Sequence, residues 1–383
     1  MSCPASTKLC LMTTGRLVTD LKVPSVAATD LFQGGFQVVD VRSQAEFAQG
    51  HMPGAVNRPL LDDLQRAQVG TEYAERGAAQ ARLLAMDVVT PGLSAYLHEL
   101  ADLARSQAQG RRLAVMCWRG GERSRNVVLL LALVGVHAVA VTGGYRAYRK
   151  EVLTRLEAWS PPVPVVTLYG HTGAGKSALL RALQEIAPGI RGMRPWPLDL
   201  EELALHRGSL LGGLNQPGER RQKDFDALLW DELRHAQGDY LVLEGEGGKI
   251  GRIFLPATVA AAVRGGLPVG VVASVEDRAA RIVDEYAPES WGEEDVARFR
   301  RSLEMIGSRL PRDTLLSLES AFDDGRFTDV VRELLVAYYD PLYQRSSVEG
   351  RRFVYELRTS SEPLKDARRF VRAMNRVIRE VTI

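Results

Sequence analysis

A cysteine followed by a glycine- and arginine-rich turn is the first feature of the sequence that could do chemistry. Cys117 ends a short apolar run, Trp-Arg-Gly-Gly-Glu-Arg follows, and a helix is expected from about Ser124. Backbone N–H groups of residues 118–123 can surround one point, and the helix N-terminus adds its positive end. Such a loop binds an anion and stabilises a thiolate, which suits transfer of a phosphate or sulfur group. The predicted catalytic residues are Cys117, Arg119 and Arg123. The rest of the anion-binding loop is Trp118, Gly120, Gly121 and Glu122.

A second phosphate-binding loop lies further along the chain. Residues 170–177 match the P-loop pattern GxxxxGK[ST] without a mismatch, after an apolar run and before an expected helix. The lysine would reach the terminal phosphate of a ligand, and the serine could hold Mg²⁺. No base-reading motif such as NKxD is present. The loop therefore predicts binding of a diphosphate group, and the molecule that carries this group need not be a nucleotide. The predicted diphosphate-binding residues are Gly170, His171, Thr172, Gly173, Ala174, Gly175, Lys176 and Ser177.

An acidic partner for this loop is expected at the end of a later strand. The apolar run 240–243 leads directly into Glu244, and Glu246 follows two residues later. The sequence does not choose between the two. We expect Mg²⁺ as a cofactor, held by Ser177 and Glu244, and no tightly bound organic cofactor.

Both loops need strands and helices to position them. Strands are predicted at 36–41, 113–116, 138–141, 165–168, 240–243 and 268–273, and helices at 93–105 and 126–136. This alternation indicates two α/β folds with mainly parallel sheets, followed by a helical region from about Glu293. Three prolines between 161 and 164 favour an extended connector. The predicted division is a flexible leader 1–25, a first domain 26–155, a linker 156–165, a P-loop domain 166–340 and a basic segment 341–383.

Composition limits the class of protein. The 383 residues carry 49 basic and 47 acidic side chains, so net charge alone indicates no nucleic-acid partner. Three cysteines are too few to stabilise a chain of this length through disulfide bonds, and no apolar run approaches the length of a membrane span. We expect a cytoplasmic protein with no membrane partner.

Residues 36–150 resemble a rhodanese domain. The segment from Asp40 to Ala55 is similar to that family's DVR…E…GHIPGA stretch, and 141–145 resembles its closing glycine turn. The resemblance implies a cysteine that carries sulfur or selenium as a persulfide-type adduct. Five residues separate Cys117 from Arg123, whereas the common sulfurtransferase loop has four; five is the spacing of related branches that bind a tetrahedral oxyanion. Asp40, Arg42 and Glu46 are expected to form ion pairs, and His51 to belong to the loop scaffold.

A rhodanese domain followed by a P-loop domain resembles the tRNA 2-selenouridine synthase family over roughly residues 30–380. Further matching segments are 205–209, 216–217 and 244–256. Family members usually carry an ED-ES stretch where this chain has Glu244-Gly-Glu-Gly, so any role of those side chains is in doubt. The fold implied is a rhodanese-like domain, then a P-loop NTPase-like α/β domain with a helical C-terminal region.

The resemblance implies two reactions on the wobble 2-thiouridine of tRNA. Geranyl diphosphate alkylates the sulfur, and selenium from selenophosphate then displaces geranylthiol to give 2-selenouridine. The enzyme that makes selenophosphate is a further partner that the resemblance suggests. Two alternatives stay open: an ATP-dependent sulfurtransferase or kinase with a rhodanese module, and a nucleotide-gated RNA-binding protein.

Transfer RNA would need a basic surface. Residues 351–383 hold nine Arg or Lys against four acids, which fits phosphate contact or a solvated helix face equally well. The candidate tRNA-contacting residues are His206, Arg207, Arg351, Arg352, Arg368, Arg369 and Arg372.

Overall fold

The computed structural model describes residues 22–106, 110–206, 220–235, 237–245, 247–286, 288–344 and 351–381. Arg207, Glu246 and the segments 208–209 and 216–217 lie outside them. The chain divides into two compact units, Met1–Glu151 and Val152–Ile383. None of the described helices is long and apolar enough to cross a membrane.

The first unit is built on a five-stranded parallel sheet in the order β1-β5-β4-β2-β3. Its strands are β1 (Ser25–Val26), β2 (Phe36–Asp40), β3 (Val56–Asn57), β4 (Arg112–Met116) and β5 (Ala138–Val141). Its helices are η1 (Ala28–Gln33), α1 (Gln44–Ala48), α2 (Asp63–Arg76), α3 (Ala78–Val89), η2 (Thr90–Gly92), α4 (Leu93–Ser106), α5 (Glu122–Leu133) and α6 (Gly144–Glu157), the last crossing the division between units.

Burial explains why the central strand β4 is so apolar. Leu113 to Met116 are at most 1% exposed, and Leu113 and Val115 share a core with Val127, Val128 and Leu131 of α5. A parallel strand covered on both faces has no polar side to alternate with. The expected strands 113–116 and 138–141 are present, whereas the pair α2 and α3 was not predicted.

The second unit has its own five-stranded parallel sheet, in the order β12-β11-β6-β8-β7, and a small antiparallel pair β9–β10. The sheet strands are β6 (Val165–Tyr169), β7 (Pro195–Leu198), β8 (Tyr240–Glu244), β11 (Leu267–Val272) and β12 (Tyr355–Arg358); the pair is β9 (Lys249–Ile250) and β10 (Ile253–Phe254). The first helices of the unit are α7 (Lys176–Ile186), η3 (Ala187–Gly189), α8 (Leu200–Ala204), α9 (Gln222–Arg234), α10 (Ala257–Gly265) and α11 (Val275–Tyr286).

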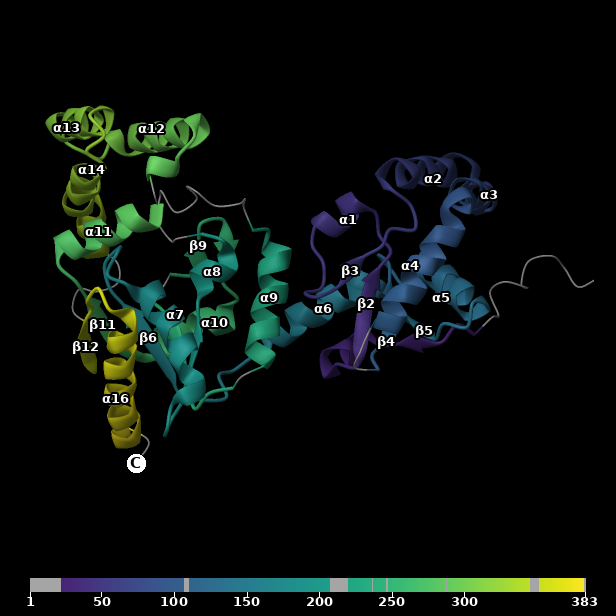
Figure 1. Ribbon diagram of the computed structural model, residues 1–383, viewed down its shortest axis with the longest axis horizontal. Coiled ribbons are helices and arrows are strands. Elements are labelled where there is room, and N and C mark those ends of the chain that lie inside the picture. The colour runs from purple at the N-terminus through teal and green to yellow at the C-terminus, as the bar shows by residue number, and fades with distance from the viewer. Residues whose placement is uncertain are drawn as a thin grey trace, which may run out of the picture. The chain divides into compact units, whose positions relative to one another are not determined.

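A mainly helical region follows, as the sequence predicts. It contains η4 (Pro288–Ser290), α12 (Glu293–Gly307), α13 (Arg312–Asp323), α14 (Phe327–Leu334), the π-helical turn η5 (Leu335–Tyr339), α15 (Asp340–Gln344) and α16 (Pro363–Val381). Figure 1 shows α12 and α13 together at one end of this unit and α16 at the other. Leu179 and Leu183 of α7 share a core with Phe370 and Met374 of α16, so the last helix covers the P-loop helix directly.

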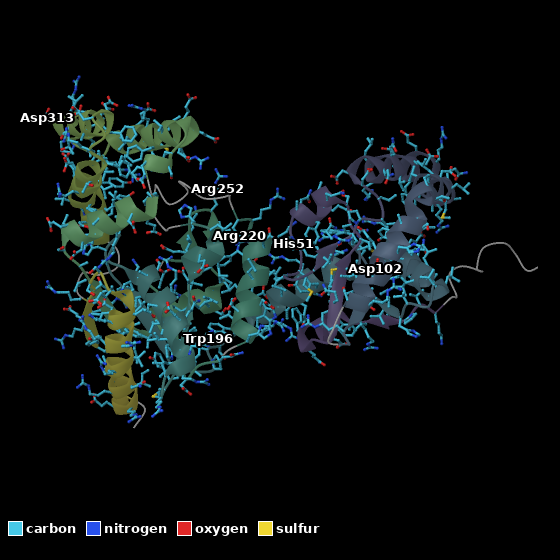
Figure 2. The ribbon with its side chains drawn as sticks, viewed as in Figure 1. His51, Asp102, Trp196, Arg220, Arg252 and Asp313 are labelled. Atoms are coloured by element: carbon cyan, nitrogen blue, oxygen red, sulfur yellow. The ribbon has the colours of Figure 1, made fainter. Side chains whose placement is uncertain are left out.

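Three edge strands of the two sheets, β1, β12 and β7, lie in segments where the sequence analysis predicts no strand. Pro24 accepts a hydrogen bond from Ala140, and Ser25 begins β1, so the end of the expected leader belongs to the first unit. β12 lies in the segment expected to be a basic tail and pairs with β11. β7 contains two prolines beside Trp196 (Figure 2) and occupies the edge position that proline tolerates.

Candidate active site: two anion-binding loops

The first loop joins the end of β4 to the start of α5. Cys117 is 3% exposed, and its Sγ lies 3.3 Å from Ser124 Oγ in the first turn of α5. The N-cap of α5 is Gly121, which offers no side-chain acceptor to the first N–H groups of the helix. Those groups are therefore directed at whatever anion the loop receives.

A glycine turn between β5 and α6 fixes the shape of this loop. The Tyr145 N–H donates to the carbonyl of Cys117 at 2.8 Å, and the Arg146 N–H donates to that of Trp118 at 3.0 Å. A Cβ at Gly144 would overlap the Cys117 carbonyl oxygen, and one at Gly120 would come within 2.5 Å of the Val141 carbonyl oxygen. The glycines at 120 and 144 thus allow the two backbones to meet.

The arginines of the loop have different environments. Arg123 is held by Glu46 through two bonds of 2.5 and 3.1 Å, whereas Arg119 is exposed. Burial disfavours the charged form of Glu46, but the hydrogen bonds and charge of Arg123 outweigh burial and lower the pKa of that carboxyl. Arg119 is the more available of the two predicted catalytic arginines. Glu122 points outward and pairs with Arg82 at 2.6 Å.

Polar residues beneath the loop are structural. Asp40 and Arg42 form a fully buried ion pair at 2.6 Å, and the Arg42 guanidinium lies 4.0 Å from the centre of the Tyr145 ring. The His51 ring stacks on Phe47 with centroids 3.9 Å apart, and its Nδ1 lies 3.2 Å from the Phe47 carbonyl oxygen (Figure 2). The expected ion pairs of Asp40, Arg42 and Glu46 are present, and His51 supports α1.

The second loop joins β6 to α7, and its backbone has the geometry that the P-loop sequence pattern predicts. Gly173 and Gly175 have φ values of +75° and +95°, which permit the tight turn. The Lys176 ammonium donates to the Gly170 carbonyl at 3.0 Å, and the Ser177 hydroxyl donates to Glu244 Oε1 at 2.9 Å. Lys176 therefore lies along the loop, where a bound phosphate would compete for it.

The pair of Ser177 and Glu244 fits Mg²⁺. Glu244 is fully buried at the end of β8, which pairs with β6 and so brings the carboxylate to the P-loop. A hydroxyl and a carboxylate are oxygen ligands of the kind that Mg²⁺ prefers beside substrate phosphates. Glu244, one of the two acids that the sequence offers, has this geometry, and Glu246 lies outside the described residues.

Three side chains from distant segments hold the P-loop carbonyls, and no local sequence pattern marks these residues. Arg278 Nε donates to Thr172 at 2.8 Å, Arg281 to Gly173 at 3.2 Å, and the Thr359 hydroxyl to Ala174 at 2.8 Å. Arg278 also forms a two-bond ion pair with Asp340, whose Oδ1 lies 3.1 Å from His171 Nδ1. Burial lowers the pKa of His171, and the charge of Asp340 offsets this only in part.

A pocket of about 500 Å³ opens above the P-loop. The P-loop residues Thr172 to Ser177 form its floor. Its walls include Arg181 and Arg281, three acids (Glu201, Asp284 and Glu285), and Ile282 and Tyr286 of α11. A diphosphate bound at the loop would therefore have two arginines within the same pocket, but the acids offset their charge in the lining as a whole.

The candidate tRNA residues that the structure describes have different environments. His206 packs on the backbone of Gly251, and the Arg351 guanidinium lies 4.2 Å from the centre of the Tyr169 ring. Arg352 is exposed, and Arg369 bonds to Asp366 and to the Arg358 carbonyl. The helix α16 buries its apolar side and exposes one basic row, which consists of Arg368, Arg372, Arg376 and Arg379.

The local structure explains why residue 245 is a glycine. A Cβ there would lie 2.5 Å from the Tyr169 ring and 2.9 Å from the Leu168 carbonyl oxygen. Tyr169 thus occupies the space that a side chain at 245 would need. Gly247 has open space around it, and nothing in the structure explains that glycine.

Comparisons with known proteins match both units. The family described as "tRNA 2-selenouridine synthase AAA domain" matches residues 163–369, and "Rhodanese-like domain" matches residues 24–151. The chain is 33% identical over 341 residues to the tRNA 2-selenouridine synthase of Cupriavidus pinatubonensis, covering 82% of this chain and 89% of that protein. It is 32% identical over 354 residues to the Bdellovibrio bacteriovorus enzyme of the same name, with the same two coverages. The predicted fold class is confirmed.

Proposed function

Because the chain belongs to the tRNA 2-selenouridine synthase family, we propose that it geranylates wobble 2-thiouridine in tRNA and then replaces the S-geranyl group with selenium. One observation carries the proposal: a single chain holds two separate anion loops, one beginning with a buried thiol and the other carrying a lysine and a serine that pairs with a glutamate. Two different phosphate-bearing donors, geranyl diphosphate and selenophosphate, would each have a loop suited to it.

The first step belongs to the P-loop. The 2-thio sulfur attacks C1 of the geranyl group, a C–S bond forms, and the C–O bond to diphosphate breaks. The leaving diphosphate takes the electron pair, and Lys176 with the N–H groups of the loop neutralises the charge that develops. Ser177 and Glu244 would hold Mg²⁺, which supplies further charge neutralisation when bound. Uridine N3 loses its proton, so the product is a neutral S-geranyl base.

The second step belongs to the Cys117 loop. Selenophosphate is a tetrahedral oxyanion, which the N–H groups at the start of α5 and the exposed Arg119 can bind beside the thiol. As the C–Se bond forms at C2 of the base, the C–S bond breaks and geranylthiol leaves. The Cys117 thiolate takes the phosphoryl group as the Se–P bond breaks and then loses it to water, so one S-geranyl base, one selenophosphate and one water give 2-selenouridine, geranylthiol and phosphate. Alkylation in the first step is what makes the sulfur a good leaving group.

Transfer RNA must be held while both steps take place. The basic row on α16 has Arg368 and Arg372 among its members and lies on the outer side of a helix that packs against α7. Phosphate contacts from such a row would weaken as salt rises. We propose this row, rather than His206, as the tRNA contact of the second unit.

The test is mass spectrometry of nucleosides from tRNA bearing 2-thiouridine. With geranyl diphosphate alone, S-geranyl-2-thiouridine should accumulate; adding selenophosphate should convert it to 2-selenouridine and release geranylthiol. A parallel reaction with ATP instead of geranyl diphosphate is the control. Steady ATP hydrolysis stimulated by tRNA, with no S-geranyl product in the first reaction, would overturn the proposal in favour of an ATP-dependent enzyme.

A further inference from the structure

The residue that follows Cys117 is an exposed aromatic ring. All five tryptophans of the chain lie within the described residues, and Trp118 alone among them is exposed, with 36% of its surface accessible. One exposed apolar residue needs no explanation by itself. Trp118 differs from a scattered surface residue because it stands between Cys117 and Arg119 in the anion-binding loop.

Two buried groups hold the indole on its inner side. The centroid of the Tyr145 ring lies 5.8 Å from that of the indole, and the Arg42 guanidinium lies 5.9 Å from the same point. Both supporting side chains are at most 1% exposed, so the accessible part of the indole is the part that faces away from them. The Trp118 carbonyl also accepts the N–H of Arg146 at 3.0 Å, which fixes the backbone that carries the ring.

These contacts place the ring at the carboxyl edge of the first sheet. Trp118 follows the central strand β4, Arg42 follows β2, and Tyr145 comes shortly after β5, the strand on the other side of β4. Ligands of open parallel sheets bind at this edge. Cys117 lies at the same edge, so a substrate that reacts at the Cys117 loop approaches the indole as well.

The second step of the proposed function requires a base to be held beside the thiol. Its substrate is a base of the anticodon, which is a single-stranded loop, and bases of single-stranded loops are recognised by stacking on aromatic side chains. Two exposed arginines adjoin the indole: Arg119 follows it in the chain, and Arg146 is bonded to its carbonyl. An aromatic face combined with cations for the backbone phosphates is the usual composition of a site for single-stranded nucleic acid.

We infer that Trp118 is the stacking platform for the alkylated wobble base during selenation. The inference rests on the proposed function and adds to it the side chain that holds the base at the Cys117 loop. The ring binds the base, whereas the backbone N–H of the same residue belongs to the anion-binding loop. An indole could instead contact the geranyl chain, and the experiment separates the two roles.

Two variants at one position distinguish stacking from apolar contact. Trp118→Phe keeps an aromatic face, whereas Trp118→Leu keeps apolar bulk without one. Tyr73→Leu is the control, because Tyr73 is a 62% exposed ring on α2 of the same unit, outside the loop. The substrates are two anticodon stem–loop RNAs, one with S-geranyl-2-thiouridine and one with S-methyl-2-thiouridine at the wobble position. The second RNA offers the same base without the long chain and would release methanethiol.

Steady-state selenation by the full chain would be measured for each RNA at saturating selenophosphate. Trp118→Leu should raise KM for both RNAs by about tenfold, and Trp118→Phe by less than about threefold, because a phenyl ring still stacks. Tyr73→Leu should leave KM unchanged. The KM for selenophosphate should change little in every variant, since backbone N–H groups bind the anion. Binding of either RNA should quench the tryptophan fluorescence of wild type more than that of Trp118→Phe.

The failures are distinguishable. If wild type converts neither RNA to 2-selenouridine, the second step of the proposed function fails and this inference fails with it. If wild type is active but Trp118→Leu has a normal KM for RNA, or Tyr73→Leu raises KM equally, only the stacking role is wrong. An increase confined to the S-geranyl RNA, equal for Trp118→Phe and Trp118→Leu, would assign the ring to the hydrocarbon chain and overturn the inference. An equal rise in KM for selenophosphate would overturn it too, because Trp118 would then only shape the loop.

Discussion

The loop after Cys117 and the P-loop have the same local build, since each follows a central parallel strand and precedes a helix. They differ in what fixes the backbone. Carbonyls of the Cys117 loop are held by backbone N–H groups of one neighbouring turn, those of Tyr145 and Arg146. Carbonyls of the P-loop are held by side chains that lie 106, 108 and 185 residues away along the chain.

This difference suits the two donors that we propose. A loop clamped by backbone has one shape, which is appropriate for a small anion such as selenophosphate beside a buried thiol. A loop held by Arg278, Arg281 and Thr359 is coupled to α11 and to the end of β12, and therefore to the walls of its pocket. A ligand with a large organic group can be recognised along with its phosphates in such an arrangement.

The largest expected effect separates the two loops at Cys117. Cys117→Ser should abolish formation of 2-selenouridine while leaving S-geranylation largely intact, because alkylation needs no thiolate. Nucleoside mass spectrometry with both donors would detect accumulation of the S-geranyl intermediate. Serine is close in size to cysteine and can keep the contact to Ser124, so the fold should be retained. Full selenation by this variant would remove Cys117 from the mechanism.

The complementary change is in the P-loop. Lys176→Ala should slow geranylation by about 10²–10³, the usual effect of removing one group that stabilises developing charge. The same variant should still convert tRNA that already carries the S-geranyl group. Supplying that intermediate is the control, since it bypasses the damaged loop. Loss of both steps in a folded variant that binds tRNA would show that the P-loop serves the whole cycle.

Metal removal should affect the same loop. Excess chelator should strongly reduce geranylation, because the leaving diphosphate needs its charge neutralised, and added Mg²⁺ should restore it. Conversion of pre-geranylated tRNA in the same chelator provides the comparison and should change little. Undiminished geranylation in chelator would argue against Ser177 and Glu244 as a metal site.

Whether a residue of this site can be predicted from the sequence depends on how far along the chain it lies from the residues that it contacts. Cys117 and Lys176 stand in contiguous motifs whose strand, turn and helix are encoded side by side, so both loops could be located. Arg278 and Thr359 reach the P-loop only through the fold, and no local pattern marks them. Arg123 could be placed in the Cys117 loop, but its pairing with Glu46, 77 residues away, could not be predicted from spacing.

The two edge strands of the second sheet were missed for a related reason. β7 contains prolines and β12 contains charged residues, so neither shows the apolar run by which buried strands are found. Edge strands tolerate both kinds of residue because one side of their backbone needs no partner.

A smaller effect is expected from filling the contact between the glycine turn and the Cys117 loop. Gly144→Ala would force the Cys117 carbonyl to move and should slow selenation of pre-geranylated tRNA by about 10²-fold, as a misplacement of about 1 Å can. Gly54→Ala is the matched control: both glycines have positive φ, +57° and +74°, but Gly54 has nothing near its Cβ position. If both variants slow selenation equally, backbone strain alone, without the clash, explains the slowing.

The smallest effect concerns the ion pair that holds Arg123. The pKa of Glu46 is lowered in the folded state, so its charge stabilises the fold above the unfolded value of about 4.3, and this contribution is lost as pH falls through the folded value. Glu46→Gln keeps an acceptor for the Ser43 N–H but removes the charge, and it should lower the free energy of unfolding of the first unit by about 1 kcal/mol near pH 7, because water still screens the pair. The difference from wild type should shrink toward zero below about pH 4.

Thermal unfolding followed at several pH values would measure this difference. Glu122→Gln is the control, since the Glu122–Arg82 pair is more exposed and should contribute less to stability. A pH-independent difference between wild type and Glu46→Gln would mean that the charge on Glu46 does not contribute and that Arg123 is positioned by packing instead.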